Sequence, residues 1–249
     1  MHLAQHNALI LTGASHGIGR ALAGQLAAAR IPLVLNGRDA DALKRVLEIC
    51  RDHSLQVEAV PGDIGQPATA EHLVQTALNL APQVGGFIHA AGVLAPGPAV
   101  WELTADRVEQ VLGASLVGSF HLIRACVPSM RTQGQGLAVF FGSGAAEKTQ
   151  PGIAAYCAAK SGEEHLARQL ATEAPELSVL VYRPGIVDTQ MQTQARESQG
   201  QSADDLRRVF IPWKEKGLLI SAEQSAQGLL RILHSDTPLT GQTLDIRSL

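Results

Sequence analysis

A short segment near the N-terminus constrains the fold most, because an apolar run passes directly into a glycine-rich turn and then into a helical pattern. Ala8 to Leu11 predicts a buried strand, and a helix is expected from about Ile18 to Arg30. Glycines in the turn let the backbone approach a pyrophosphate, which the positive end of the helix attracts. An ordinary strand-to-helix turn is the alternative, but this order favours dinucleotide binding. The expected contacts are Gly13, Ser15, His16, Gly17, Ile18 and Gly19.

Apolar runs and helical patterns alternate along the rest of the chain. Further strands are expected at 32–35, 57–60, 86–89, 137–141, 177–182 and 243–246. Such alternation predicts an α/β, Rossmann-type, doubly wound fold: a seven-stranded parallel sheet with helices on both faces. A length of 249 residues, 45% of them hydrophobic, fits a single domain over 1–249.

Charge and composition argue against several classes of partner. A net charge of -3 gives no electrostatic case for nucleic acid or an anionic membrane surface, so a small-molecule partner is expected. Met1 to Asn7 is too short and polar for a signal peptide, and no uninterrupted apolar run approaches the roughly 20 residues that span a bilayer. A cytoplasmic protein is therefore expected. Three separated cysteines favour reduced thiols, and nine histidines without H-x-x-x-H spacing predict no metal site.

Tyr156 and Lys160 are the first candidates for catalysis. On a helix this spacing places a phenol and an ammonium on one face, where the cation favours the phenolate and tunes the phenol for proton transfer. Ser143 follows the apolar run 137–141, and its hydroxyl could bind a carbonyl oxygen at the carboxyl end of a parallel strand. Taken alone, the Tyr-Lys pair is more often a half-buried ring beside a solvated cation.

The ends of the next strands suggest how a cofactor is held. Neither Asn36 nor Gly37, which follow the second strand, is acidic, and Arg38 supplies a planar cationic fork that suits a 2'-phosphate, which predicts NADP(H). The alternative is a solvated arginine that opens the next helix. Asp63, with Ile64 beside it, is expected to hydrogen-bond the adenine, unless it is a plain turn aspartate. After the fourth strand, small residues would let the cofactor lie against the sheet: Ala90, Ala91 and Gly92.

One polar stretch interrupts the alternation. Residues from about 189 to 216 are rich in glutamine and lie between the sixth strand and the last helix. An insertion there is placed to cover substrate, so a mobile lid is expected, with a low-complexity linker as the alternative. An amphipathic piece from Leu206 to Phe210 and the nearby Trp213 favour the lid.

Four motifs stand in a fixed order along the chain: Thr12-Gly13-x-x-x-Gly17-x-Gly19, Ser143, Tyr156-x-x-x-Lys160 and Pro184-Gly185. Together they resemble the motifs of the short-chain dehydrogenase/reductases, and the resemblance covers essentially the whole chain. The resemblance implies a nicotinamide cofactor, hydride transfer between carbonyl and alcohol, and a homodimer or homotetramer. Tyr156 would donate the proton, Lys160 would hold the nicotinamide ribose, and Ser143 would orient the substrate oxygen. Ile186, Val187 and Thr189 would line the nicotinamide amide, and Pro184 and Gly185 would also bind the cofactor.

Two positions depart from the family pattern. Ala90 replaces an asparagine that commonly braces the strand end, and Ser115 stands where the family carries a catalytic asparagine. In the family that asparagine supports a water through its main-chain carbonyl, at a local helix distortion. Because serine can also bond to the backbone and bend a helix, we expect the proton relay to survive with Ser115 in it.

Segments 184–192 and 240–245 are similar to sepiapterin reductases and the related benzil reductases, which reduce dicarbonyls with NADPH. The expected function is therefore an NADPH-dependent reductase of a ketone or dicarbonyl. A 3-oxoacyl thioester or hydroxysteroid oxidoreductase is the alternative within the family, and a catalytically weak NADP-binding sensor is the alternative outside it. Asp245 either anchors a pterin or only finishes the last strand.

Overall fold

The computed structural model describes residues 7–236 and 238–248, so Met1 to His6, which bear on the signal-peptide expectation, lie outside the described residues. Within them, parallel strands form one sheet in the order β3-β2-β1-β4-β5-β6-β7. This confirms the predicted seven-stranded parallel sheet. The strands are β1 (Ala8–Thr12), β2 (Leu33–Gly37), β3 (Val57–Pro61), β4 (Val84–His89), β5 (Leu137–Phe141), β6 (Ser178–Arg183) and β7 (Gln242–Asp245).

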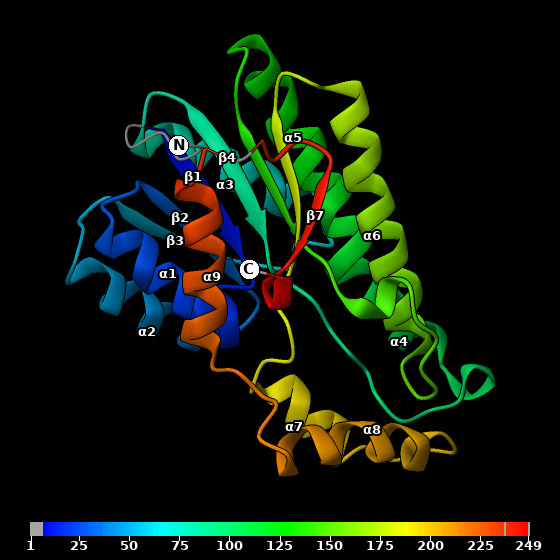
Figure 1. Cartoon of the computed structure of the whole chain (residues 1–249). Coiled ribbons are helices and arrows are strands. Elements are labelled where there is room, and N and C mark those ends of the chain that lie inside the picture. The colour runs from blue at the N-terminus through cyan, green and yellow to red at the C-terminus, as the bar shows by residue number, and fades with distance from the viewer. Residues whose placement is uncertain (1–6, 237, 249) are drawn as a thin grey trace.

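Helices cover both faces of the sheet (Figure 1). Side chains alternate along a strand, so Leu9 and Leu11 of β1 join one apolar core while Ile10 joins the other. The first core is closed by α1 (Gly17–Ala28), α2 (Ala40–Arg51) and α9 (Ala222–His234). The second is closed by α3 (Pro67–Leu80), α5 (Gly118–Thr132) and α6 (Ala154–Glu173).

Polar side chains begin several helices by accepting hydrogen bonds from free N–H groups of the first turn. The carboxylate of Asp39 accepts from the N–H of Ala42 at 2.9 Å and caps α2. The side chain of Thr104 accepts from the N–H of Arg107 and caps α4 (Ala105–Leu112).

The helix that starts after Thr104 changes character in its middle. A π-helical segment, Gly113–Val117, joins α4 to α5. Among the described residues, the combined run Ala105–Thr132 is long and apolar enough to span a bilayer. An 18-residue window within it has a mean hydropathy of 1.4, and 44% of that window is buried in the protein. Core helices meet the same criterion, so this is weak evidence for a membrane span.

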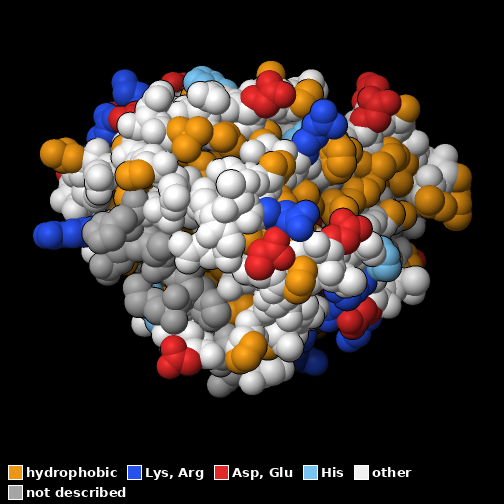
Figure 2. Space-filling view, turned by 90° about the horizontal axis from the view of Figure 1, so that it is seen from above, with side chains coloured by type: hydrophobic (Ala, Val, Ile, Leu, Met, Phe, Trp, Pro, Cys, Tyr) orange, Lys and Arg blue, Asp and Glu red, His pale blue; other side chains and the backbone are white. Residues whose placement is uncertain are grey.

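Some large apolar side chains remain on the surface. Trp101 is 76% exposed, and Val117 and Phe120 are exposed where the π-helical segment meets α5. On the face shown in Figure 2, apolar side chains gather into a patch toward one side, and charged side chains surround it. Exposed apolar patches are typical of interaction surfaces, but the oligomeric state stays a prediction.

Candidate active site

A cavity of about 800 Å³ lies at the carboxyl ends of the strands. The helices α7 (Gln190–Arg196) and α8 (Ala203–Glu215) lie beyond this edge of the sheet (Figure 1). All the predicted cofactor residues line the cavity, and so do Ser143, Tyr156 and Lys160. Ser115 is the exception among the predicted site residues, since it is completely buried and does not line the cavity.

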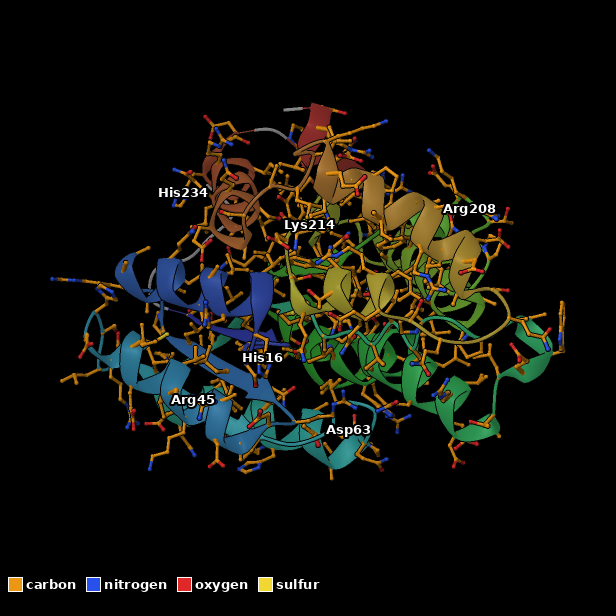
Figure 3. The ribbon with its side chains drawn as sticks, turned by 90° about the horizontal axis from the view of Figure 1, so that it is seen from below. His16, Arg45, Asp63, Arg208, Lys214 and His234 are labelled. Carbon is orange, nitrogen blue, oxygen red and sulfur yellow. The ribbon has the colours of Figure 1, made fainter. Side chains whose placement is uncertain are left out.

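The glycine turn forms one wall of the cavity. Gly13 has a φ of 69°, and a Cβ there would lie 2.6 Å from the backbone N of Ala91, so only glycine fits this close approach. His16 precedes α1 without capping it, and the first turn of α1 holds no acidic residue, which leaves N–H groups for an anion. Figure 3 shows His16 at this end of α1. The side-chain atom Cγ2 of Thr189 would lie 3.2 Å from a Cβ at Gly17, so the segment after β6 closes on this wall.

The ends of β2 and β3 form the adjoining wall. The buried amide of Asn36 donates to the carbonyl oxygens of Val60 and Gly62 at 3.0 and 3.1 Å and ties the two strand ends together. Arg38 lies exposed at the cavity and forms no ion pair with any described residue. Asp63 lines the cavity while its Oδ1 accepts from the N–H of Gly65 at 2.9 Å, so it is a turn aspartate whatever else it binds.

Together these walls fit a nicotinamide dinucleotide. They combine an uncapped helix N-terminus, a glycine turn packed on backbone and a crevice at the carboxyl edge of a parallel sheet.

Two hydrogen bonds fix the position of Ser143, which lies just after the end of β5. Its N–H donates to Oε1 of Glu164 at 3.1 Å, and its Oγ accepts from the N–H of Ala145 at 3.1 Å. Because Oγ is used as an acceptor, the hydroxyl proton stays free for donation within the cavity.

Lys160 lies beneath Tyr156 on α6, with its Nζ 5.8 Å from the centre of the half-buried ring. Lys160 is 3% exposed, and its ammonium donates to the carbonyl of Phe141 at 2.8 Å and to Oε2 of Glu163 at 2.7 Å. Burial alone lowers the pKa of Lys160, but the charge of Glu163 and the neighbouring Tyr156 outweigh burial and raise that pKa. Two of three donors are used, which leaves one for the cavity.

His89, the last residue of β4, is completely buried and was not predicted to belong to the site. Its Nε2 lies 2.9 Å from the carbonyl oxygen of Ser115, and its Nδ1 lies 2.8 Å from Oγ1 of Thr12. Burial, and then the charge of Lys160, lower its pKa to about 3, so the ring is neutral. A carbonyl only accepts, so Nε2 carries the proton and Thr12 donates to Nδ1. His89 thus braces the end of β4, where the family asparagine is absent.

Ser115 lies in the π-helical segment, which is the local distortion that was expected there. Its carbonyl oxygen accepts from His89 and, at 2.8 Å, from Oγ of Ser119, so both lone pairs are engaged. Its own Oγ finds no partner among the described residues. The role of Ser115 in a proton relay stays a prediction.

A second buried carboxylate anchors the other catalytic candidate. Glu164 is 1% exposed and accepts from Ser143 and from the guanidinium of Arg183, whose Nε and Nη2 lie 2.9 and 2.7 Å from its oxygens. Arg183 also donates to the exposed Glu147 at 2.7 Å. The pair joins α6 to the ends of β5 and β6.

The stretch 189–216 folds as the two helices α7 and α8, and not as a low-complexity linker. Four apolar side chains form part of the cavity lining, called here the apolar pocket: Leu94, Ile153, Phe210 and Trp213. Leu206 and Phe210 of α8 pack with Leu94 and Ile153, and the half-buried Trp213 lies with its ring centre 4.7 Å from that of Phe210. Tyr156 borders the same cluster, so the apolar pocket meets the catalytic candidates.

Asp245, the candidate pterin anchor, lines the cavity at the end of β7. Its Oδ1 accepts from the side chain of Arg247 at 2.8 Å, and this bond lowers the pKa of Asp245. The negative charge of Asp245 is therefore already balanced by Arg247, two residues along the chain.

Such a parallel sheet, with a dinucleotide crevice and a Ser, Tyr and Lys set in one cavity, defines an oxidoreductase that acts on CH-OH or C=O groups with a nicotinamide cofactor. Known proteins agree with this class. The model of the family described as short chain dehydrogenase matches residues 7–200. The chain belongs to this family, as the motifs predicted.

Individual relatives refine the comparison. Sepiapterin reductase from Bos taurus is 33% identical over 95% of this chain and 92% of its own length. The NADPH-dependent pterin aldehyde reductase of Arabidopsis thaliana is 27% identical over 74% of this chain and 76% of its own. Among solved structures, the KRED1-Pglu enzyme superposes with a TM-score of 0.84 at 28% identity, covering 96% of this chain and 100% of that one. These similarities support the predicted sepiapterin reductase-like subgroup.

Proposed function

We propose that the protein is an NADPH-dependent carbonyl reductase that transfers hydride to a ketone or dicarbonyl, with Tyr156 as the proton donor. One observation carries the proposal: Ser143, Tyr156 and Lys160 line the cavity that the dinucleotide walls and the apolar pocket of α8 share. Names of the relatives, sepiapterin reductase and an NADPH-dependent pterin aldehyde reductase, support both the reaction and the coenzyme.

Choice of the phosphorylated coenzyme rests on Arg38. It lies exposed at the cavity without an ion-pair partner among the described residues, directly after β2. A free guanidinium there suits a 2'-phosphate. Neither Asn36 nor Gly37 is acidic, and an acidic residue at this strand end would favour the unphosphorylated coenzyme.

Three side chains of this chain carry the proton and charge chemistry. When bound, the cofactor supplies the hydride that reaches the carbonyl carbon. Ser143 donates its free hydroxyl hydrogen to the substrate oxygen and stabilises the negative charge that develops on it. Tyr156 gives its O–H proton to that oxygen, and the resulting phenolate is stabilised by the remaining donor of Lys160.

The apolar pocket bounds the substrate. Phe210 and Trp213 suit a substrate with an aromatic or apolar body, and loss of water beneath α8 strengthens the polar contacts at the carbonyl. Closure of 189–216 over the substrate is part of the proposal.

Turnover of a small panel tests the proposal. NADPH and NADH oxidation are followed with sepiapterin, benzil, diacetyl and a 3-oxoacyl thioester. Reduction of a dicarbonyl with a preference for NADPH is expected. Turnover of the thioester alone would favour the other enzymatic reading, and silence on every carbonyl despite tight NADPH binding would favour a sensor.

A further inference from the structure

A buried ion pair lies behind the proposed proton donor, and no part of the reaction described so far uses its acidic member. Glu163 follows Lys160 by one turn of α6 and is completely buried. Its Oε2 accepts from the Lys160 ammonium at 2.7 Å, and its Oε1 lies 4.0 Å from Nε2 of His89. A buried carboxylate is costly unless it is paired, so its placement calls for a physical reason.

No other cation competes with Lys160 for this carboxylate among the described residues. His89 of β4 is neutral, because its Nε2 proton is committed to Ser115 and burial opposes a second proton. Ser119 of α5, which also lies against the carboxylate, carries no charge. The remaining charged neighbour is Glu164, which is already paired with Arg183. Glu163 therefore acts on Lys160 alone.

The pair fixes both the position and the charge of the lysine. A lysine stem has many rotamers, and the two contacts with Phe141 and Glu163 select one that brings Nζ beneath the Tyr156 ring. Without the carboxylate, the buried ammonium would keep only a carbonyl dipole as partner, and burial would favour loss of its proton.

We propose that Glu163 is a positioning residue for the reduction: its carboxylate clamps the Lys160 ammonium against the Phe141 carbonyl and keeps it charged beside Tyr156. This role rests on the proposed reductase function, whereas the effect on the charge of Lys160 does not. The two claims can therefore be tested separately.

The kinetic test uses Glu163→Gln, which keeps the shape and an oxygen acceptor but removes the charge. Lys160 then loses its proton more easily, and the Tyr156 phenolate loses its stabilising cation at a lower pH. The alkaline limb of the plot of kcat against pH is therefore expected to move at least about one pH unit toward acid. At pH values between the original and the shifted limb, kcat falls about tenfold while KM stays within about twofold. Glu163→Asp restores the charge and is expected to return the limb toward its original pH, while Glu173→Gln, at an exposed site on the same helix, is the matched control.

A purely structural role predicts something else. If Glu163→Gln lowers the amount of folded protein or kcat at every pH without moving the limb, or if Glu163→Asp behaves like Glu163→Gln, the proposal is overturned.

A second readout needs no turnover. In protein labelled with ¹³C-lysine, the methylene signal next to Nζ reports the charge of each lysine, and Lys160→Met identifies the signal of Lys160. Unmodified protein should keep the Lys160 proton to a pH above the ordinary lysine pKa of 10.5, and Glu163→Gln should lower that pH. Loss of the Lys160 proton below pH 10.5 in unmodified protein would overturn the proposal even if Glu163→Gln fails to fold. If Lys160 titrates as expected but the protein reduces no carbonyl, the reductase function alone is refuted.

Discussion

Glu164→Gln is the substitution whose effect follows most directly from the contacts. The change removes the charge of a carboxylate that receives three hydrogen bonds, from Ser143 at 3.1 Å and from the Nε and Nη2 of Arg183 at 2.9 and 2.7 Å. The glutamine amide turns an –NH₂ group toward at least one of these donors. Both stability and the position of Ser143 should suffer.

The magnitude follows from burial. The side chain of Glu164 is 2% exposed and that of Arg183 12% exposed, so water replaces little of the lost interaction. Removing one partner of a buried pair costs about 3–5 kcal/mol, and we take about 3 because glutamine retains one acceptor. For a chain of this size, about 2–4 °C of Tm follow each kcal/mol, which gives a loss of roughly 6–12 °C.

Calorimetry and steady-state kinetics measure the two effects. Glu147→Gln is the matched control, because Glu147 contacts the same Arg183 at 2.7 Å but is 66% exposed, and its Tm should stay unchanged. We expect Glu164→Gln to lose kcat as well, since the N–H of Ser143 loses its anchor. Equal Tm values for the two variants would refute the reasoning.

Other substitutions test the remaining parts of the site. Arg38→Ala should weaken NADPH about 10- to 100-fold and NADH less than about twofold, as measured by fluorescence titration; equal weakening would remove Arg38 from 2'-phosphate binding. Phe210→Ala should raise KM for benzil about tenfold but leave KM for diacetyl within about twofold, and a parallel rise for diacetyl would contradict the apolar pocket. His89 has a pKa lowered from 6.5 to about 3, so it contributes stability that is present above pH 6.5 and is lost as the pH falls toward 3. His89→Asn should flatten the fall of Tm over this window, and an unchanged slope would exclude His89 as its source.

Local chemistry explains which elements could be read from the sequence. The predicted boundaries of β5 agree with the structure to the residue, because a continuous apolar run defines this strand. The strand β2 was expected to end at Leu35 but continues to Gly37, since Asn36 is buried by a side-chain bond to the neighbouring strand. A polar residue at a strand end gives no periodic signal of such burial.

The same limit applies to the site. The cofactor and catalytic residues were predictable because they stand at fixed spacings in a glycine turn, at strand ends and on one face of a helix. Glu163 and Glu164 were missed because acidic residues on a helix usually face water, and only the packing of α6 against β5, β6 and the π-helical segment buries them. One signal was available: Glu163 is three residues after Lys160, a spacing that places two side chains on one helical face.

The central claim is that Tyr156 donates the proton in an NADPH-dependent reduction, and Tyr156→Phe tests it most directly. Phenylalanine keeps the ring above Lys160 and removes only the hydroxyl. NADPH binding, measured by fluorescence titration, should stay within about twofold, while kcat for a dicarbonyl falls by at least about 10²-fold. A variant that still reduces the dicarbonyl at a similar rate, or one that loses NADPH binding and turnover together, would contradict this account.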